Sequence, residues 1–177
     1  MQVSEIIKIC KKNKRLKILK GENGITYNSD YVGIYTLPDN LNDITKAEII
    51  CMYDIDESKV YMEELETPYD MESMADEGIE IVAAEENVYM IIGNVTVKAI
   101  TDGKNAVFID ADYLKPLKKH KKDYITYTKR GESIIIKDGL TPIAQIAGMK
   151  IKDEKIIDTV SMISRYLENQ READENE

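Results

Sequence analysis

Two clusters of basic residues are the part of this sequence best suited to binding chemistry. Residues 8–20 hold seven Lys and Arg and no acidic residue, although the chain of 177 residues has a formal net charge of -9. Residues 115–130 hold seven more. Within each cluster, four basic residues recur at i, i+3, i+4 and i+7, a spacing that places side chains on one face of a helix. The first set is Lys8, Lys11, Lys12 and Arg15, and the second is Lys115, Lys118, Lys119 and Lys122.

Lysines spaced evenly along a helix suit sequence-independent contact with the phosphate backbone of DNA or RNA. Because the two sets contain little Arg, direct reading of base edges is not indicated. Like charges at i,i+4 cost about 0.2–0.5 kcal/mol per pair, so folding alone does not favour such crowding. The alternative is a solvated helix face whose charge is offset by acidic residues of the same or a neighbouring chain.

An acidic segment, residues 54–86, contains thirteen Asp and Glu and one basic residue, Lys59. Such a surface could occupy the basic groove in which a nuclease holds its nucleic acid. A divalent-metal nuclease site would first be sought at Asp54 and Asp56, but "YDIDES" lacks the Gly and terminal Glu of a calcium loop. We therefore expect no metal and no cofactor. The residues assigned to the acidic partner surface are Glu63, Glu64, Glu66, Asp70, Glu72, Asp76 and Glu77.

Residues for covalent or acid–base catalysis are scarce. A Ser/His/Asp or Cys/His arrangement would have to use His120, the only histidine, whose Lys neighbours disfavour its charged form. We expect His120 to be a solvated residue. No Gly-rich phosphate loop is present, because "GENG" and "KDG" are typical of turns. The sequence therefore predicts a non-enzymatic protein.

The cysteines and the N-terminal segment indicate the cellular compartment in which we expect the protein. Cys10 and Cys51 fit neither a CxxC motif nor a disulfide framework, and their apolar neighbours predict reduced core cysteines. Residues 1–14 lack the apolar core of a signal peptide, and no apolar run approaches the roughly 18 residues of a membrane span. We expect a cytoplasmic protein of a bacterial host cell, with no membrane partner.

Two helix-plus-strands units would position the basic residues. Residues 3–14 have an apolar stripe at i, i+3, i+4 and i+7, which predicts a helix, and three strand patterns follow before Pro38. The segment 110–122 predicts a second helix, capped by Asp110 or Asp112, and residues 123–151 supply three more strands. Shifting the first unit by 107 positions aligns the apolar stripe Ile6, Ile7 and Cys10 with Tyr113, Leu114 and Leu117, which suggests an internal repeat.

Between the two units the patterns are more varied. Residues 42–55 predict a helix with Asp43 as its cap. The acidic segment 54–86 contains a strand pattern and a loop or short helix. Strands 79–109 follow, with "GN" and "DGKN" as hairpin-type turns.

The elements together predict an α+β fold. One domain over residues 1–151 is made of two pseudo-repeats, about 1–38 and 106–151, of a helix followed by antiparallel strands. Residues 152–170 predict a C-terminal amphipathic helix, and the acidic tail 171–177 is expected to fray.

This pattern resembles one domain of a DNA sliding clamp. The segments "VSEIIKICKKNK" and "DADYLKPLKKHKK" match its two helices, and "IIIKDGLTPIAQIAGMKI" matches its closing strands. The resemblance covers roughly residues 1–151 and implies paired helices that face DNA, with the sheets outside. A clamp ring is assembled from several such domains, whereas one chain here supplies one. The acidic segment and the C-terminal helix have no counterpart in the pattern, so a ring is not implied.

The short length and the bias towards Lys, Ile, Asn and Glu are also similar to small proteins of prophages and mobile elements in low-GC Gram-positive bacteria, including type II-A anti-CRISPR proteins. That resemblance implies an inhibitor of an RNA-guided DNA nuclease, with the basic helices holding guide RNA or DNA. Three functions therefore stay open: such an antagonist, a clamp-like DNA-binding accessory factor in phage replication, and an oligomeric structural protein. Edge strands and the C-terminal helix favour a homodimer.

Overall fold

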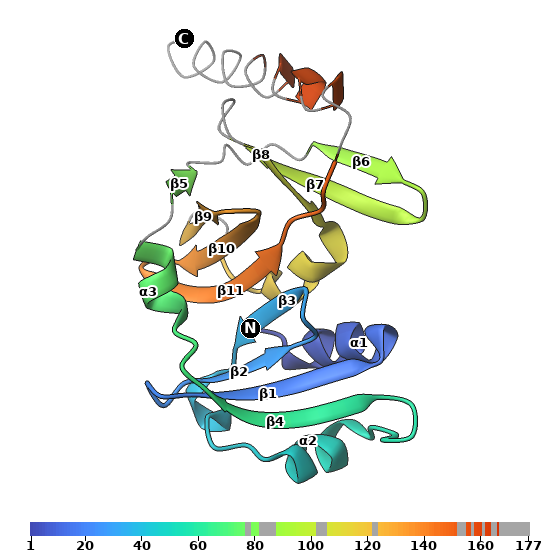
Figure 1. Ribbon diagram of the computed structural model, residues 1–177, viewed down its shortest axis with the longest axis vertical. Helices are drawn as coiled ribbons and strands as arrows, with labels where there is room; N and C mark the ends of the chain where they lie inside the picture. The colour runs from blue at the N-terminus through green and yellow to red at the C-terminus, as the bar shows by residue number, and fades with distance from the viewer. Residues whose placement is uncertain are drawn as a thin grey trace.

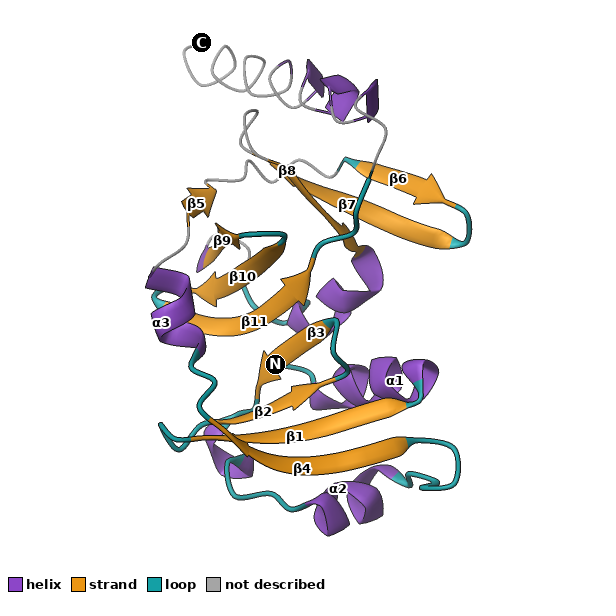
Figure 2. Ribbon diagram, viewed as in Figure 1, coloured by secondary structure: helices purple, strands orange, loops and turns teal. Residues whose placement is uncertain are grey.

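The computed structural model describes residues 1–76, 79–81, 88–101, 106–121 and 124–151, together with scattered residues between 155 and 166. The described elements form an α+β fold with an eight-stranded mixed sheet and a three-stranded antiparallel sheet (Figures 1 and 2). Helices pack on both faces of the larger sheet. The predicted α+β class is therefore confirmed.

The helices are short, and the strands hold more of the described residues than the helices do. Labels η1 and η2 denote 3-10 helices. In chain order the elements are α1 (Val3–Asn13), β1 (Arg15–Gly21), β2 (Thr26–Ser29), β3 (Gly33–Thr36), η1 (Asp39–Leu41), α2 (Lys46–Tyr53), β4 (Tyr61–Thr67), α3 (Met71–Asp76), β5 (Ile79–Ile81), β6 (Tyr89–Ile92), β7 (Val95–Thr101), β8 (Ala106–Asp110), η2 (Ala111–Leu117), β9 (Ile125–Arg130), β10 (Ser133–Asp138) and β11 (Thr141–Ala147).

The larger sheet is built from two consecutive antiparallel triplets of strands. The triplets β1-β2-β3 and β9-β10-β11 meet where β3 pairs antiparallel with β11, with Ile34 opposite Gln145. At one end β4 pairs with β1, the only parallel pair among the described strands, and at the other end β5 pairs with β9. Each predicted unit therefore contributes a triplet, and the two triplets share one sheet.

Alternation along the strands separates the two faces of this sheet. Leu16 and Ile18 of β1 join the main core with the apolar stripe of α1, residues of η2 and Ile49 of α2. The residues of β1 that alternate with these, among them Arg15 and Lys17, lie on the opposite face. On that face α3 packs its Met71 against the far end of the sheet. The predicted apolar stripe of α1 is confirmed, since Ile6, Ile7 and Cys10 are buried.

The smaller sheet has strand order β6-β7-β8 and packs between two apolar clusters. Ile100, Val107 and Ile109 face the main core, whereas Val97 and Phe108 face a separate cluster that includes Val160. Figure 1 shows the β6–β7 hairpin beside η2 at the edge of the molecule. The predicted C-terminal helix and acidic tail fall largely outside the described residues, so both stay predictions.

Helix α2 begins later than predicted. Its N-cap is Thr45, whose side chain accepts from the Glu48 amide (3.3 Å), while the Glu48 carboxylate accepts from the Thr45 amide (2.8 Å). This capping box satisfies two amide donors at once, which a cap at Asp43 alone would not do. The prediction that Asp43 caps the helix is therefore wrong.

The second predicted helix is also shorter and of a different type. It is the 3-10 helix η2, which ends at Leu117 instead of continuing as an α-helix to residue 122. Pro116 lacks the amide that would donate to residue 112, and its ring obstructs regular α-helical bonding there. The cap at Asp110 is confirmed, because its carboxylate accepts from the Asp112 amide at 2.8 Å.

Candidate nucleic-acid interface

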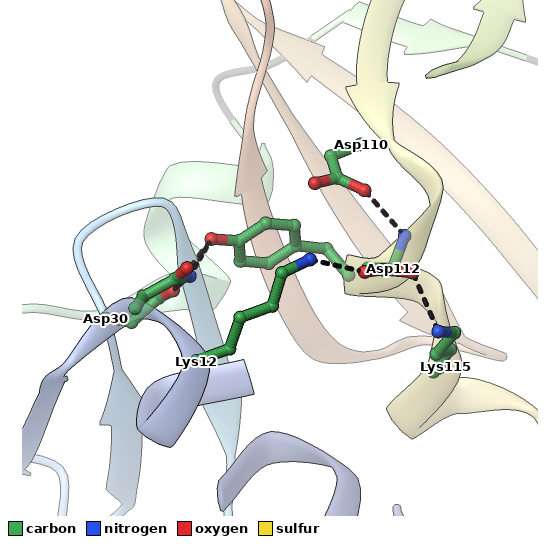
Figure 3. A network of polar contacts seen from close by, with 7 residues as sticks. Lys12, Asp30, Asp110, Asp112 and Lys115 are labelled. Carbon is green, nitrogen blue, oxygen red and sulfur yellow. Dashed lines mark hydrogen bonds and ion pairs between the residues drawn. The ribbon is translucent and has the colours of Figure 1, made fainter. Parts of the chain in front are cut away.

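Helices α1 and η2 lie side by side and run in opposite directions. At one end the Gln2 amide donates to the Pro116 carbonyl (2.9 Å), and at the other Lys12 Nζ donates to Asp112 Oδ2 (2.8 Å). Figure 3 shows the second contact, which joins two residues one hundred positions apart in the chain. The two segments predicted to carry the basic sets are therefore neighbours in space.

Asp112 is the point where the two segments meet. Its carboxylate binds Lys115 of its own helix at 2.7 Å and Lys12 of α1 at 2.8 Å (Figure 3). Hydrogen bonds from two lysines lower the pKa of Asp112, and the bond from Lys115 has a larger effect than the bond from Lys12. The bond between Lys12 and Asp112 also raises the pKa of Lys12. Two cations around one carboxylate leave a net positive charge, and both lysines remain solvent-exposed.

Three further lysines extend this positive region. Lys8 is exposed on α1 and forms an ion pair with Glu5 (2.6 Å). Lys118 lies one 3-10 turn beyond Lys115, and its amide donates to the Lys115 carbonyl at 3.3 Å. Lys118 and Lys119 are exposed and form no ion pair with the residues that the structure describes. We define the helix-pair surface as Lys8, Lys12, Lys115, Lys118 and Lys119.

Lys119 belongs to the same region because it lies near the start of α1. The pKa of the Met1 amino group is lowered chiefly by burial, with a smaller contribution in the same direction from the Lys119 charge. The Asp138 carboxylate acts in the opposite direction. The end of η2 and the beginning of α1 are thus close enough for their charges to interact.

Three of the predicted basic residues are not on the helix-pair surface. Lys11 Nζ donates to the Tyr53 carbonyl (2.7 Å) and the Asp54 carbonyl (3.0 Å), so it caps the C-terminus of α2. Arg15 lies beyond the end of α1, on the first position of β1, and its guanidinium is 5.1 Å from the centroid of the Tyr31 ring. Lys122 lies outside the described residues.

A buried carboxylate behind the helix pair holds this arrangement together. Asp30 Oδ2 accepts from Asn13 Nδ2 (2.6 Å) and from the Tyr113 hydroxyl (2.7 Å). Asp30 Oδ1 accepts from the amides of Val32 (3.1 Å) and Gly33 (2.9 Å). The network therefore joins the end of α1, η2 and the β2–β3 turn.

Neither this network nor the exposed Tyr31 next to it was predicted from the sequence. The signal was present in "NSDYVG", because an Asp before a tight turn commonly bonds the amides that follow it. The contact with Tyr113 had no local signal, since the two residues are far apart in the chain.

The acidic residues of β4 are divided between the two faces of the sheet. Glu63 lies on the same face as Lys17 and forms an ion pair with it at 2.8 Å. Glu64 and Glu66 alternate to the other face, where Glu64 Oε2 accepts from the Lys46 amide of α2 (3.0 Å).

The remaining acidic residues belong to α3 and its start. Asp70 Oδ1 accepts from the Glu72 amide at 3.0 Å, and Glu72 and Asp76 are exposed. Glu77 lies outside the described residues. The described members of the predicted acidic set are therefore not gathered on one face of the sheet.

Possible catalytic and metal-binding residues have local structural partners. His120 Nδ1 lies 2.6 Å from Asp138 Oδ2 in a partly buried contact, so the expectation of a solvated histidine is wrong. Asp56 binds Lys59 and Ser58, which together lower its pKa to about 2, with Lys59 the largest cause. Asp54 ends α2 in a left-handed conformation. Among the described residues no group of His, Cys, Asp and Glu is arranged to hold a metal ion.

The cysteine prediction is half right. Cys10 is buried in the main core, where burial raises the pKa of its thiol, but Cys51 is exposed on α2. Within the described part of the chain, no helix has the length and apolar character to cross a membrane. Comparison of the chain with protein-family models, with curated proteins and with solved structures finds no match.

Proposed function

We propose that this is a non-enzymatic protein that binds the phosphate backbone of DNA or RNA through the helix-pair surface. The observation that carries the proposal is the convergence of Lys12 and Lys115 at Asp112, with Lys118 and Lys119 exposed beside them. A chain with net charge -9 gathers cations from two distant segments at one place. Lysine-rich surfaces of this kind favour phosphate contact without sequence readout.

The net charge of the helix-pair surface sets the expected strength of binding. Glu5 and Asp112 each offset one of the five lysines, which leaves about three net positive charges. Each neutralised phosphate of a duplex contributes about -0.9 to the slope of log affinity against log salt, so we expect a slope of about -3. Non-specific binding of this kind has a dissociation constant of roughly 10⁻⁴–10⁻⁶ M at physiological salt.

The test is fluorescence anisotropy with a labelled duplex and an RNA of equal length, between about 50 and 200 mM salt. The double variant Lys115→Glu/Lys118→Glu should reduce affinity at least about tenfold and flatten the salt slope by about 2. Lys59→Glu/Lys150→Glu makes the same change in net charge at exposed lysines elsewhere, and should stay within about twofold of wild type. Equal losses in both variants, or no binding at the lowest salt, would overturn the proposal.

We further propose that the biological target is a nucleic-acid enzyme, most specifically an RNA-guided DNA nuclease, which the protein inhibits. The resemblance to anti-CRISPR proteins suggests this class of target. The helix-pair surface and the exposed acids of α3, Glu72 and Asp76, lie on different faces of the sheet. One face could therefore contact guide RNA or DNA while the other contacts a basic protein groove. Cleavage assays with several purified nucleases test this, and undiminished cleavage by all of them counts against it.

A clamp-like accessory factor is the second candidate, favoured by the strand order of the larger sheet. Two triplets meet at β3 and β11, and α1 and η2 both pack on the same face. This is the arrangement that the resemblance to a sliding-clamp domain implies. A clamp-like factor should bind duplex DNA and increase the processivity of a phage polymerase without inhibiting a nuclease.

An oligomeric structural protein is the third candidate, and the β6 strand favours the homodimer it requires. The outer edge of β6 pairs with no other described strand, and Ile91 is 80% exposed. Exposed apolar edge strands promote pairing between chains. Sedimentation equilibrium gives the mass in solution, and a strict monomer would exclude this candidate.

A further inference from the structure

The turn between β2 and β3 holds a tyrosine in an unusual backbone conformation. The Asp30 amide donates to the Gly33 carbonyl (3.2 Å), so Tyr31 and Val32 are the central residues of a two-residue hairpin loop. Tyr31 has φ of 78°. Positive φ at the first central position of such a loop favours Gly, and a bulky side chain there is strained.

Tyr31 is kept in this conformation although the core does not use its side chain. Its amide donates to Ser29 Oγ (3.1 Å), and the Asp30 carboxylate fixes the two amides that follow. The Tyr31 side chain is 53% exposed. Because Gly would relieve the strain and nothing in the core requires the ring, the tyrosine is better explained by what its ring contacts at the surface.

Two cations of β1 lie against this ring. The Arg15 guanidinium lies 5.1 Å and Lys17 Nζ lies 4.3 Å from the ring centroid, within the range of cation–π attraction. Lys17 is also paired with Glu63 at 2.8 Å. Arg15 forms no ion pair with the described residues, so its charge is available to a ligand.

A second exposed tyrosine flanks Arg15 on its other side. In the parallel pairing of β1 with β4, Arg15 lies opposite Tyr61, and the Tyr61 amide donates to the Lys14 carbonyl at 3.0 Å. The Tyr61 side chain is 57% exposed. Residues paired across adjacent strands share a face of the sheet, so Arg15 lies between two exposed rings.

The spacing of the rings selects the form of nucleic acid. The β2–β3 turn and β4 flank β1, and two strand spacings are about 10 Å. Bases within one strand of a duplex are about 3.4 Å apart, and their faces are covered by their neighbours. Single-stranded bases can be unstacked and splayed apart, and aromatic side chains interleaved with basic residues are the usual surface for them.

We propose that Tyr31, Arg15 and Tyr61 form a binding site for single-stranded nucleic acid of any sequence. One base stacks on each ring, and Arg15 contacts the phosphate between them. This site lies on the opposite face of the larger sheet from the helix-pair surface, because Leu16 and Ile18 of the same strand face α1. It can therefore bind whether or not the helix-pair surface does.

The test is the affinity of the full chain for a labelled oligothymidine of about 16 nucleotides, measured by anisotropy at low salt. Tyr31→Leu and Tyr61→Leu should each weaken binding about tenfold, because each removes one stacked base. Phe at either position keeps the ring and should stay within about twofold of wild type. Tyr124→Leu is the matched control, since Tyr124 is also exposed (56%) and has Lys121 5.9 Å from its ring centroid.

The variant Tyr31→Gly separates binding from folding. Gly adopts positive φ without strain, so this variant should fold as well as wild type and yet bind the oligothymidine as weakly as Tyr31→Leu. Wild-type affinity in Tyr31→Gly, or equal losses in the Phe and Leu variants, would overturn the site. So would failure of the wild-type protein to bind the oligothymidine.

The same experiment distinguishes the two surfaces. Loss of duplex binding in Lys115→Glu/Lys118→Glu with no effect of the Tyr variants on the oligothymidine would overturn this site and leave the helix-pair surface in place. The reverse pattern would overturn the helix-pair surface and support the tyrosine site.

Discussion

Asp30 is the residue on which the geometry of both surfaces depends. It is almost completely buried, and its two oxygens accept four hydrogen bonds from α1, η2 and its own turn. A buried carboxylate is tolerated only when its oxygens are satisfied in this way. The same side chain therefore fixes the position of η2, which carries Lys115, and the conformation of Tyr31.

Loss of one of these donors should be measurable in stability. Tyr113→Phe removes the hydroxyl that bonds Asp30 Oδ2 and keeps the buried ring. Because a hydrogen bond to a charged group contributes about 1.5–3 kcal/mol, we expect the free energy of unfolding to fall by that amount. The measurement is the midpoint of urea unfolding at constant m value. Tyr124→Phe, which removes an exposed hydroxyl, is the control, and equal losses in both would contradict the network's role.

Alkaline pH should destabilise the protein through a second buried tyrosine. The Tyr35 hydroxyl donates to the Tyr113 carbonyl (2.7 Å), and burial raises the pKa of Tyr35 well above its ordinary value of 10.0. Above pH 10 the unfolded chain loses this proton while the folded chain keeps it, so Tyr35 alone lowers stability as pH rises, by up to about 1.4 kcal/mol per pH unit. Urea midpoints between about pH 9 and 11 measure this slope. Tyr35→Phe should flatten it, and an unchanged slope would contradict the assignment.

At the scale of elements, the start of α2 provides a direct comparison between two possible caps. Thr45→Ala removes the side chain of the capping box and should lower the free energy of unfolding by about 1 kcal/mol. Asp43→Ala, two residues earlier, should change it by less than about 0.5 kcal/mol, because Asp43 is exposed and does not cap the helix. Urea unfolding of both variants checks this, and a larger loss in Asp43→Ala would refute the observed cap.

The elements that the sequence predicted correctly are those with a strong local pattern. The apolar stripe of α1 and the strand patterns of β1 to β3 and β9 to β11 depend on residues only a few positions apart. The second basic helix was mispredicted because its spacing of Lys residues was counted through Pro116. The pairing of β3 with β11 and of β1 with β4 could not be predicted, since it depends on contacts between distant segments.

The residues of the candidate sites divide in the same way, into those with a local sequence pattern and those that only the fold brings together. Lys8, Lys12 and Lys115 were identified because composition alone marks a basic cluster. The role of Lys11 at the end of α2 depends on tertiary packing, and so does the row of Tyr31, Arg15 and Tyr61. Side chains that strand order brings together have no characteristic spacing along the sequence, so no local pattern predicts them.

At the scale of the whole molecule, the basic helix-pair surface belongs to a protein whose net charge is -9. The described acids of β4 and α3 are spread over both faces of the sheet, and Glu72 and Asp76 are exposed. A polyanion is therefore attracted by the nearby lysines and repelled by the chain as a whole.

This long-range repulsion can be isolated by varying salt. The double variant Glu72→Gln/Asp76→Asn removes two charges on the opposite face from the helix pair. At about 0.01 M salt the screening length is about 30 Å, so duplex affinity should rise a few-fold; at 0.15 M it is about 8 Å, and affinity should stay within about twofold. Anisotropy at the two concentrations measures this. An equal gain at both would indicate a direct contact of α3 with the duplex instead.

The pairing of β3 with β11 also determines when the larger sheet can be completed during synthesis. Ile34 leaves the ribosome long before its partner Gln145 has been made. A ribosome adds roughly 5–20 residues per second, so the interval is on the order of ten seconds. Throughout that time the nascent β1-β2-β3 hairpins have an open edge at Gly33–Thr36, where another chain could pair. The yield of folded protein in a cell should therefore depend on translation speed and on chaperones that cover this edge.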